Sequence, residues 1–303
     1  MAASTTTMLT QANGHQPRAA QVALQTPAER DDRDAFDSEE FEDGRASLPY
    51  LQMLNHQDPE QAGFFITAEN MEVVQFTPNA EWRPYTATFQ SGETAEGYRS
   101  LVARFLILRR SRLLMFERES GDFLGEYQKS QYDRTTMVLK TRYLVFLVGK
   151  NKQLLHGSPL LLTTKGSFCG SFGETVKTFH SAMSKAYGVA TGARKPRGDR
   201  FLALSILAVR VQPELKGTTK KSWVCSVSDC GIPTAENWQS YFVGYHPELK
   251  EKVLAVFEDW SDFGKPQSEV AAQDYRRQES QVAEHEHDDG EDWQETSAAY
   301  EEL

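Results

Sequence analysis

Apolar and polar residues alternate with a period of two over much of the middle of the chain, which predicts β-strands. The clearest example is residues 135–149, TTMVLKTRYLVFLVG. Its odd positions from Met137 to Leu147 are apolar except at Thr141, while Lys140 and Arg142 share the opposite face. This pattern predicts a strand with one face packed in a core and the other open to a ligand.

Other runs predict further strands around this one. Short β-rich runs bounded by Gly, Pro, Asn or Ser occupy residues 64–67, 72–77, 81–90, 100–119 and 221–228. The segment 91–97, SGETAEG, is expected to be a loop. Residues 201–211, FLALSILAVRV, are apolar on both faces, which is typical of a central strand covered on both sides.

Two segments change to the period of a helix. Ser171-x-x-Glu174 fits a capping box, and apolar residues then recur every three or four positions up to Gly188. A second helix is expected over residues 247–260, with Pro247 in its first turn. Together the patterns predict an α+β domain over residues 47–264. Its core would be β-rich, with an OB-like or otherwise curved antiparallel sheet and one or two packed helices.

Composition separates both ends of the chain from this domain. Residues 1–46 and 265–303 are acidic and poor in apolar residues, so we expect two disordered segments. The C-terminal segment can be read as a mimic of a polyanion that competes for a basic surface, as a protein-binding tail, or as a solubilising tail. No apolar run resembles a signal peptide or a membrane span, and three cysteines are too few for a disulfide framework. We therefore expect a soluble, cytoplasmic protein.

The net charge of −10 conceals a basic middle. Residues 101–200 hold 18 Lys and Arg against 7 Asp and Glu. Proteins that bind single strands combine a cationic groove for phosphates with aromatic faces on which bases stack, often on a small barrel. The chain offers both kinds of side chain, although basic strands also serve simply as solvated or charged edges.

We assign the candidate residues to three groups. The strand cations, expected to hold phosphates, are Arg104, Arg109, Arg110, Arg112, Arg118, Lys129, Arg134, Lys140, Arg142, Lys150 and Lys152. The loop cations, expected to close over a bound strand, are Arg194, Lys195, Arg197 and Arg200. The rings expected to stack on bases are Tyr127, Tyr132 and Tyr143.

Catalytic patterns are weak in this sequence. Gly166, Gly170 and Gly173 do not form a phosphate-binding loop, because the lysine precedes the glycines. Asp199 followed by Glu214-Leu215-Lys216 is only a faint match to metal-dependent nucleases. We therefore expect no enzymatic activity, no cofactor and no metal. The expected function is binding of single-stranded nucleic acid, DNA first, with little sequence preference, in replication, recombination or mobile-element maintenance. The alternative is a non-enzymatic adaptor or assembly protein whose basic face binds an acidic protein.

Several stretches carry a resemblance to known families. LPYLQMLN, GFFI, RFLILRRSR, TRYLVFLVG and HGSPLLLTTKGSF, within about residues 47–260, resemble a cyanobacterial family defined as a domain of unknown function. This resemblance implies no activity. The opening PYLxxLN followed by GFFI is also similar, more loosely, to phage-type single-stranded-DNA-binding proteins, which likewise end in acidic tails. No functional residue is carried over from either family.

Overall fold

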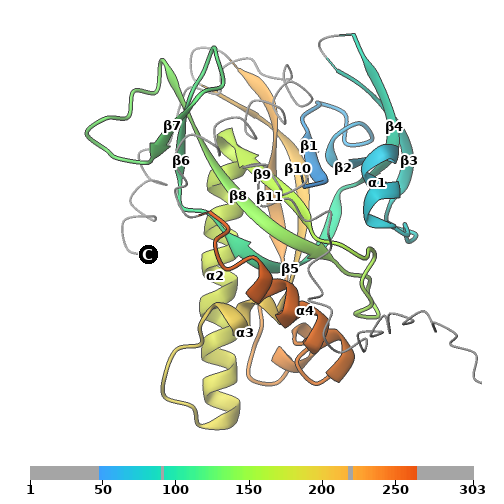
Figure 1. Ribbon diagram of the computed structural model, residues 1–303, viewed down its shortest axis with the longest axis vertical. Coiled ribbons are helices and arrows are strands. Elements are labelled where there is room, and N and C mark those ends of the chain that lie inside the picture. Colours follow the sequence, from blue (N-terminus) through green and yellow to red (C-terminus); the bar gives the residue numbers. More distant parts are fainter. Residues whose placement is uncertain (1–47, 90–91, 218–220, 265–303) are drawn as a thin grey trace, which may run out of the picture. The chain divides into compact units, whose positions relative to one another are not determined.

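The computed structural model describes residues 48–89, 92–217 and 221–264, which belong to one compact unit (Figure 1). The predicted acidic segments 1–46 and 265–303 lie outside these residues. Within the described part of the chain, eleven strands form one sheet, accompanied by helices, so the predicted α+β class is confirmed. The strands are β1 (Tyr50–Leu54), β2 (Gly63–Thr67), β3 (Arg83–Thr88), β4 (Thr94–Ser100), β5 (Val102–Arg110), β6 (Leu114–Glu117), β7 (Phe123–Glu126), β8 (Met137–Leu147), β9 (Leu160–Lys165), β10 (Ile206–Lys216) and β11 (Ser222–Cys230). The helices are α1 (Ala68–Val74), α2 (Gly166–Thr191), α3 (Asp199–Ala203), α4 (Pro247–Asp259) and the 3₁₀ helix η2 (Trp238–Tyr241).

The sheet has the strand order β11-β10-β5-β8-β9-β1-β2-β4-β3, and β6 pairs with both β7 and β8. β8 carries β9 on one edge, while its other edge carries β5 along one half and β6 along the other. Neighbours are antiparallel except for β1 and β9, which run parallel. The sheet is therefore mixed rather than purely antiparallel as predicted.

The sheet is curved because two nearly continuous strands, β4 and β5, pair with different parts of it. Leu101 alone separates β4, which pairs with β2, from β5, which pairs with β8 and β10. On the other side, β11 closes onto the end of β1. The backbone N–H of Cys225 donates to Asn55 Oδ1 at 2.8 Å, and Cys225 Sγ lies 3.3 Å from the Leu54 carbonyl oxygen. Part of the hydrogen bonding along the edge of β11 thus goes to side chains instead of to another strand.

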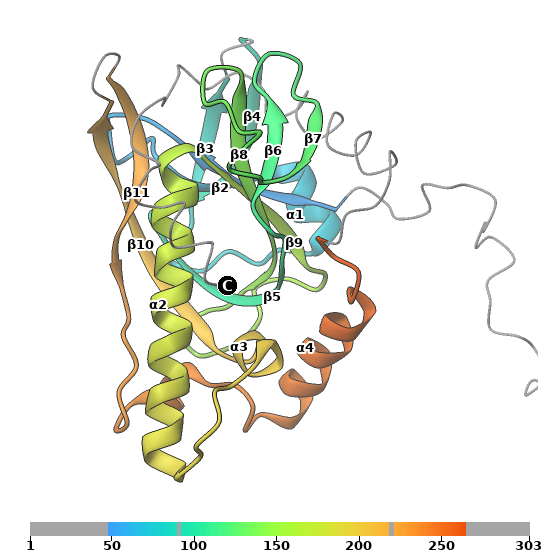
Figure 2. The same ribbon diagram turned by 90° about the vertical axis from the view of Figure 1, so that its left-hand side faces the viewer.

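Two cores cover opposite faces of the central strands. Phe105 and Ile107 of β5 pack in the core that contains α2, whereas Leu106 and Leu108 pack against α3 and α4. β8 divides in the same way, because alternate residues of a strand point to opposite faces. Figure 2 shows α2 alongside β10 and β11, with α3 and α4 at the lower part of the view. β5 and the second half of β8 are therefore buried on both faces.

The long helix begins earlier and ends later than predicted. α2 runs from Gly166 to Thr191, and Ser171 lies inside it instead of capping it. Its C-cap is Gly192, which adopts a left-handed conformation with φ 73°. The early start places Phe168 in the core, where its ring centroid lies 5.3 Å from that of Phe172. Burial of this additional turn explains why the helix begins before Ser171, where the capping box was expected.

Three other predicted elements differ from the structure. Residues 68–74 form α1 instead of the strand expected over 72–77, and Thr67 Oγ1 caps it by accepting from the Asn70 N–H at 3.3 Å. The segment 201–211 is divided between α3 and β10, so its first apolar residues belong to a helix. β4 begins at Thr94, inside the expected loop. The predicted strands at 64–67, 135–149 and 221–228 and the helix at 247–260 correspond to β2, β8, β11 and α4, with bounds that differ by a few residues at most. No helix in the described part of the chain is long and apolar enough to cross a membrane.

Candidate nucleic-acid interface

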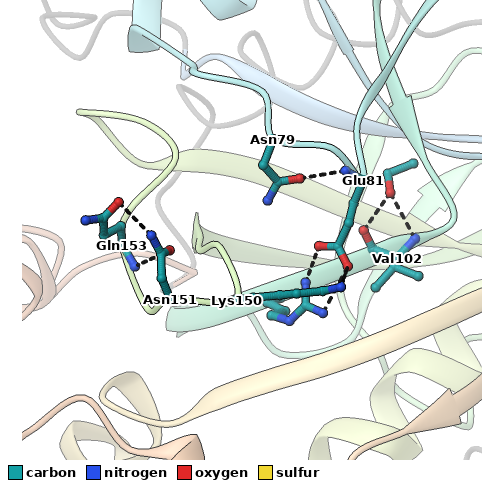
Figure 3. Close-up of polar contacts among 8 residues, drawn as sticks. Asn79, Glu81, Val102, Lys150, Asn151 and Gln153 are labelled. Carbon is teal, nitrogen blue, oxygen red and sulfur yellow. Dashed lines mark hydrogen bonds and ion pairs between the residues drawn. The ribbon is translucent and has the colours of Figure 1, made fainter.

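Two of the predicted phosphate ligands share one carboxylate. Arg104 on β5 forms a bidentate ion pair with Glu81, in which Nη2 lies 3.1 Å from Oε1, and Lys150 Nζ lies 3.5 Å from the same oxygen. Figure 3 shows the Lys150 ammonium directed at the Glu81 carboxylate. Burial raises the pKa of Glu81, but the hydrogen bond and charge of Arg104, together with Lys150, outweigh it and leave this pKa below its usual value. Arg104 and Lys150 are therefore already neutralised in part.

Two further strand cations attach other segments to the sheet. Arg109 donates from Nε to the Phe257 carbonyl at 2.9 Å, and its guanidinium carbon lies 3.5 Å from the centroid of the Phe257 ring. Lys152 donates from Nζ to the carbonyls of Gln239 and Phe242 at 2.9 and 3.1 Å. Desolvation lowers the pKa of Lys152. These side chains hold α4 and the η2 segment in place, and their donors are occupied by backbone carbonyls.

The face of β8 that was expected to meet a ligand is covered. Lys140 is 5% exposed, with its ammonium 4.4 Å from the centroid of the Phe116 ring, and Arg142 is half-buried. On the opposite face of β8, Tyr143 is 1% exposed and packs edge-on against Phe172, with ring centroids 5.1 Å apart. Burial raises the pKa of Tyr143 far above its ordinary value. A ring enclosed in this way cannot stack on a base, so the role predicted for Tyr143 is wrong for this structure, and Lys140 is likewise inaccessible.

The β6–β7 region holds the next group of predicted residues. Arg112 forms an exposed ion pair with Glu126 at 2.8 Å, and Arg118 Nη2 donates to the carbonyls of Arg134 and Met137 at 3.0 and 3.1 Å. Tyr127 and Tyr132 are half-buried, and their rings pack edge-on against each other with centroids 5.7 Å apart. Both also pack against a small cluster that contains Leu113 and Met115. Lys129 and Arg134 are exposed. This region therefore keeps part of its charge at the surface while its rings pack inward.

The loop between α2 and α3 holds Arg194, Lys195 and Arg197, and Arg200 lies in α3. This loop is at the opposite end of the molecule from the β6–β7 hairpin (Figures 1 and 2). Arg194 and Lys195 are exposed, and Arg200 is 64% exposed with a surface ion pair to Glu258 at 2.8 Å. The loop is fixed to α2 through the backbone of Arg197. Its N–H donates to Ser184 Oγ at 2.9 Å, and its carbonyl oxygen lies 3.1 Å from His180 Nε2. The backbone is thus anchored while most of the charged side chains reach solvent.

Arg110 joins this region from the end of β5. Burial lowers the pKa of His180, and the Arg110 charge acts in the same direction, while the Arg197 carbonyl and Asp199 oppose it. Arg110 is exposed at the end of β5, and its charge acts on His180, whose Nε2 contacts the Arg197 carbonyl oxygen, so we group Arg110 with the loop cations. Exposed ion pairs such as the one between Arg200 and Glu258 contribute at most about 1 kcal/mol, so they do not prevent exchange for a phosphate.

A chain of aromatic rings begins beneath this loop and reaches the surface at Tyr245. The Arg197 guanidinium lies 4.7 Å from the Tyr187 centroid, and the Tyr187 and Trp238 rings are 5.0 Å apart. Tyr245 lies 6.1 Å from Trp238 and 5.4 Å from Phe242, and 61% of its surface is exposed. We name Arg110, Arg194, Lys195, Arg197, Arg200 and Tyr245 the loop surface. Its aromatic member was not predicted.

Tyr245 was missed because its segment gave no clear period. Residues 235–245, AENWQSYFVGY, contain four rings and become a 3₁₀ turn followed by a single bridge between Phe242 and Ser205. The density of aromatic residues beside Gly244 was the available signal, because ring-rich irregular segments either fill a core or bind a ligand.

Neither of the weak catalytic patterns gains support from geometry. The Glu214 carboxylate lies 3.1 Å from Lys216 Nζ, in an ion pair along β10. In the described part of the chain, no group of three or more His, Cys, Asp or Glu side chains is arranged to hold a metal ion.

The fold and surface define a curved α+β protein with an exposed cationic loop beside aromatic residues. Residues 45–276 match a domain of unknown function, DUF5895, so the chain belongs to that family. No curated protein matches the chain, and no solved structure does so either.

Proposed function

We propose that the protein binds single-stranded nucleic acid, with DNA the first candidate, through the loop surface. The observation that carries the proposal is the combination of five accessible or half-buried cations with an exposed ring, Tyr245, supported by packed aromatic residues. A single strand needs cations along its phosphates and a ring face for its bases, and both lie within this region.

The proposal moves the interaction away from the strands for a physical reason. A guanidinium that already donates to a carbonyl or carboxylate must break that bond before it can bind a phosphate, whereas Arg194 and Lys195 are exposed on a loop. The backbone bonds of Arg197 limit the loop's freedom, which reduces the entropy lost on binding.

The looser similarity of the PYLxxLN and GFFI segments to phage-type single-stranded-DNA-binding proteins supports the same function, in replication, recombination or mobile-element maintenance. The loop holds one carboxylate, Asp199, among its cations, so its local charge remains positive.

Retardation of a labelled poly-dT oligonucleotide by the purified protein tests this function. If five phosphates are engaged, the logarithm of the binding constant should fall with the logarithm of salt concentration at a slope of roughly −3.5. No retardation, or a slope near zero, would contradict the proposal.

Competition separates this function from the alternative adaptor role. Unlabelled poly-dT should displace the labelled strand, while polyglutamate of equal charge should compete poorly because it has no bases to stack on Tyr245. Equal displacement by polyglutamate would favour an acidic protein partner at the same surface.

A further inference from the structure

A second surface, distant in sequence from the loop surface, has the opposite charge. A groove of about 610 Å³ lies between α1 and the β3–β4 pair. α1 contributes Ala68, Met71 and Glu72, which recur at helical spacing and so share one side of the helix, and Gln75 at its C-cap also lines the groove. Figure 1 shows α1 beside β3 and β4, at the end of the sheet where β3 lies.

The strand side of the groove is set by register. Pro84 pairs with Tyr98 and Thr86 pairs with Glu96, so these four side chains lie on one face of the β3–β4 pair, and all four residues line the groove. The intervening pair, Tyr85 and Gly97, also lines the groove, whereas Arg83 and Arg99, paired one position beyond Pro84 and Tyr98, do not. The charged residues that line the groove are thus carboxylates alone, Glu72 and Glu96.

The other lining residues favour a cation with an apolar stem. Met71, Phe76 and Tyr98 line the groove along with the two glutamates. Among the residues that the structure describes, neither glutamate has an ion-pair partner, and both are exposed. Lysine and arginine bury their methylene stems on apolar surface and place the charge beside carboxylates or ring faces.

The backbone beside the groove favours an extended occupant. β3 is the last strand in the sheet order and pairs only with β4 among the described strands. An edge strand can accept a further strand, whose alternate side chains would then enter the pockets on one face.

We propose that this groove binds an extended segment of a partner protein that places a lysine or arginine side chain between Glu72 and Glu96. The segment would lie along β3, and its cationic residue would face the two carboxylates across Met71 and Tyr98. Charge complementarity selects this occupant over nucleic acid, whose phosphates the two glutamates would repel. This proposal does not depend on the proposed function.

Binding of two labelled pentapeptides to the full chain tests the proposal by fluorescence anisotropy. The first has the sequence acetyl-Thr-Thr-Arg-Thr-Thr-amide, and the second carries Glu in place of Arg. The arginine peptide should bind and the glutamate peptide should not. Glu72→Gln and Glu96→Gln should each weaken binding about threefold, which is the fold-change expected for the loss of one exposed ion pair.

The matched control is Glu69→Gln, which removes a carboxylate from the exposed side of α1 that does not line the groove. This variant should bind the arginine peptide as tightly as the wild type. The proposal is overturned if the arginine peptide does not bind, if both peptides bind equally, or if Glu69→Gln has the same effect as Glu72→Gln. Self-association that disappears in Glu72→Gln would instead identify a second copy of the chain as the occupant and would also overturn it. These variants should bind poly-dT as the wild type does. The test of the groove is therefore independent of the test of the loop surface.

Discussion

The strand cations and the cations at residues 194–200 belong to one basic region of the sequence. Their surroundings in the structure differ. Arg104, Arg109 and Lys152 donate to a carboxylate or to carbonyls of other segments. Arg194 and Lys195 are exposed on a loop whose backbone is tied to α2. The local excess of positive charge therefore divides into two groups: these strand cations bind other segments of the protein, and the side chains of Arg194 and Lys195 stay exposed.

Adjacent residues on β5 provide the sharpest test of this difference. Arg109→Ala should lower the free energy of unfolding by about 3 kcal/mol, because it removes charged hydrogen bonds and a cation–π contact to Phe257. Its folded form should bind poly-dT as the wild type does. Arg110→Ala should do the reverse, with unchanged stability and weaker binding.

Urea unfolding and anisotropy titrations measure both quantities for each variant. If Arg109→Ala weakened binding of the folded protein while Arg110→Ala did not, the division between the two groups of cations would be wrong.

Acid should lower the free energy of unfolding through the buried side chain of His156. His156 is buried, Nε2 accepts from the Leu147 N–H at 2.8 Å, and desolvation lowers its pKa to about 4. The unfolded chain binds a proton at His156 below its ordinary pKa of 6.5, whereas the folded chain does not until about pH 4. The free energy of unfolding should therefore fall by about 3 kcal/mol as pH drops through this interval.

The contribution of His156 is isolated by comparing wild type with His156→Gln in urea at pH 7 and near pH 4. The variant should lose less stability on acidification than the wild type does. An equal loss in both proteins would show that His156 does not cause it.

The exposed ring should have a smaller effect, confined to binding. Tyr245→Ala should weaken poly-dT binding by about 1 kcal/mol, roughly fivefold, since one base loses its stacking partner. Tyr245→Phe should retain the affinity, because the ring face is kept. Tyr132→Ala serves as the comparison from the other region, and it should leave the affinity unchanged since Tyr132 packs with Tyr127. If Tyr132→Ala weakened poly-dT binding and Tyr245→Ala did not, the bases would stack in the β6–β7 region instead.

The acidic residues 266–303 should have the smallest effect. If they compete with nucleic acid, a chain ending at residue 265 should bind poly-dT more tightly at low salt, with little difference at high salt. Anisotropy titrations at two salt concentrations measure this. Identical affinities at low salt would contradict the competition.

The sequence predicted the fold better than it predicted which charged and aromatic side chains are exposed. Period-two alternation located β8, and helical spacing located α4, because both depend on local patterns. The same alternation was misleading about exposure. Leu144 and Phe146 share a face with Lys140 and Arg142, and they pack under α3 and α4, so half of that face is a second core. The apolar run from residue 143 to 148 already contained this information.

The site depended on contacts that no local pattern shows. Arg109 and Phe257 are 148 residues apart in the chain. Their contact means that Arg109, a predicted phosphate ligand, holds α4 against β5. Tyr187 and Tyr245 are connected through Trp238 only once the fold brings α2 and η2 together. Charge counts along the chain therefore identified a basic region but could not separate its accessible cations from its buried ones.

The salt dependence of poly-dT binding in charge-matched variants tests the central claim most directly. Arg194→Gln combined with Lys195→Gln should change the slope from roughly −3.5 to roughly −2.1, because two phosphate contacts are lost. Two double variants should retain the wild-type slope. One is Arg112→Gln with Lys129→Gln, and the other is Arg210→Gln with Lys221→Gln, two exposed cations in β10 and directly before β11. A slope that is unchanged in the loop variant but reduced in the Arg112 and Lys129 variant would contradict the account and place the nucleic acid on the β6–β7 region.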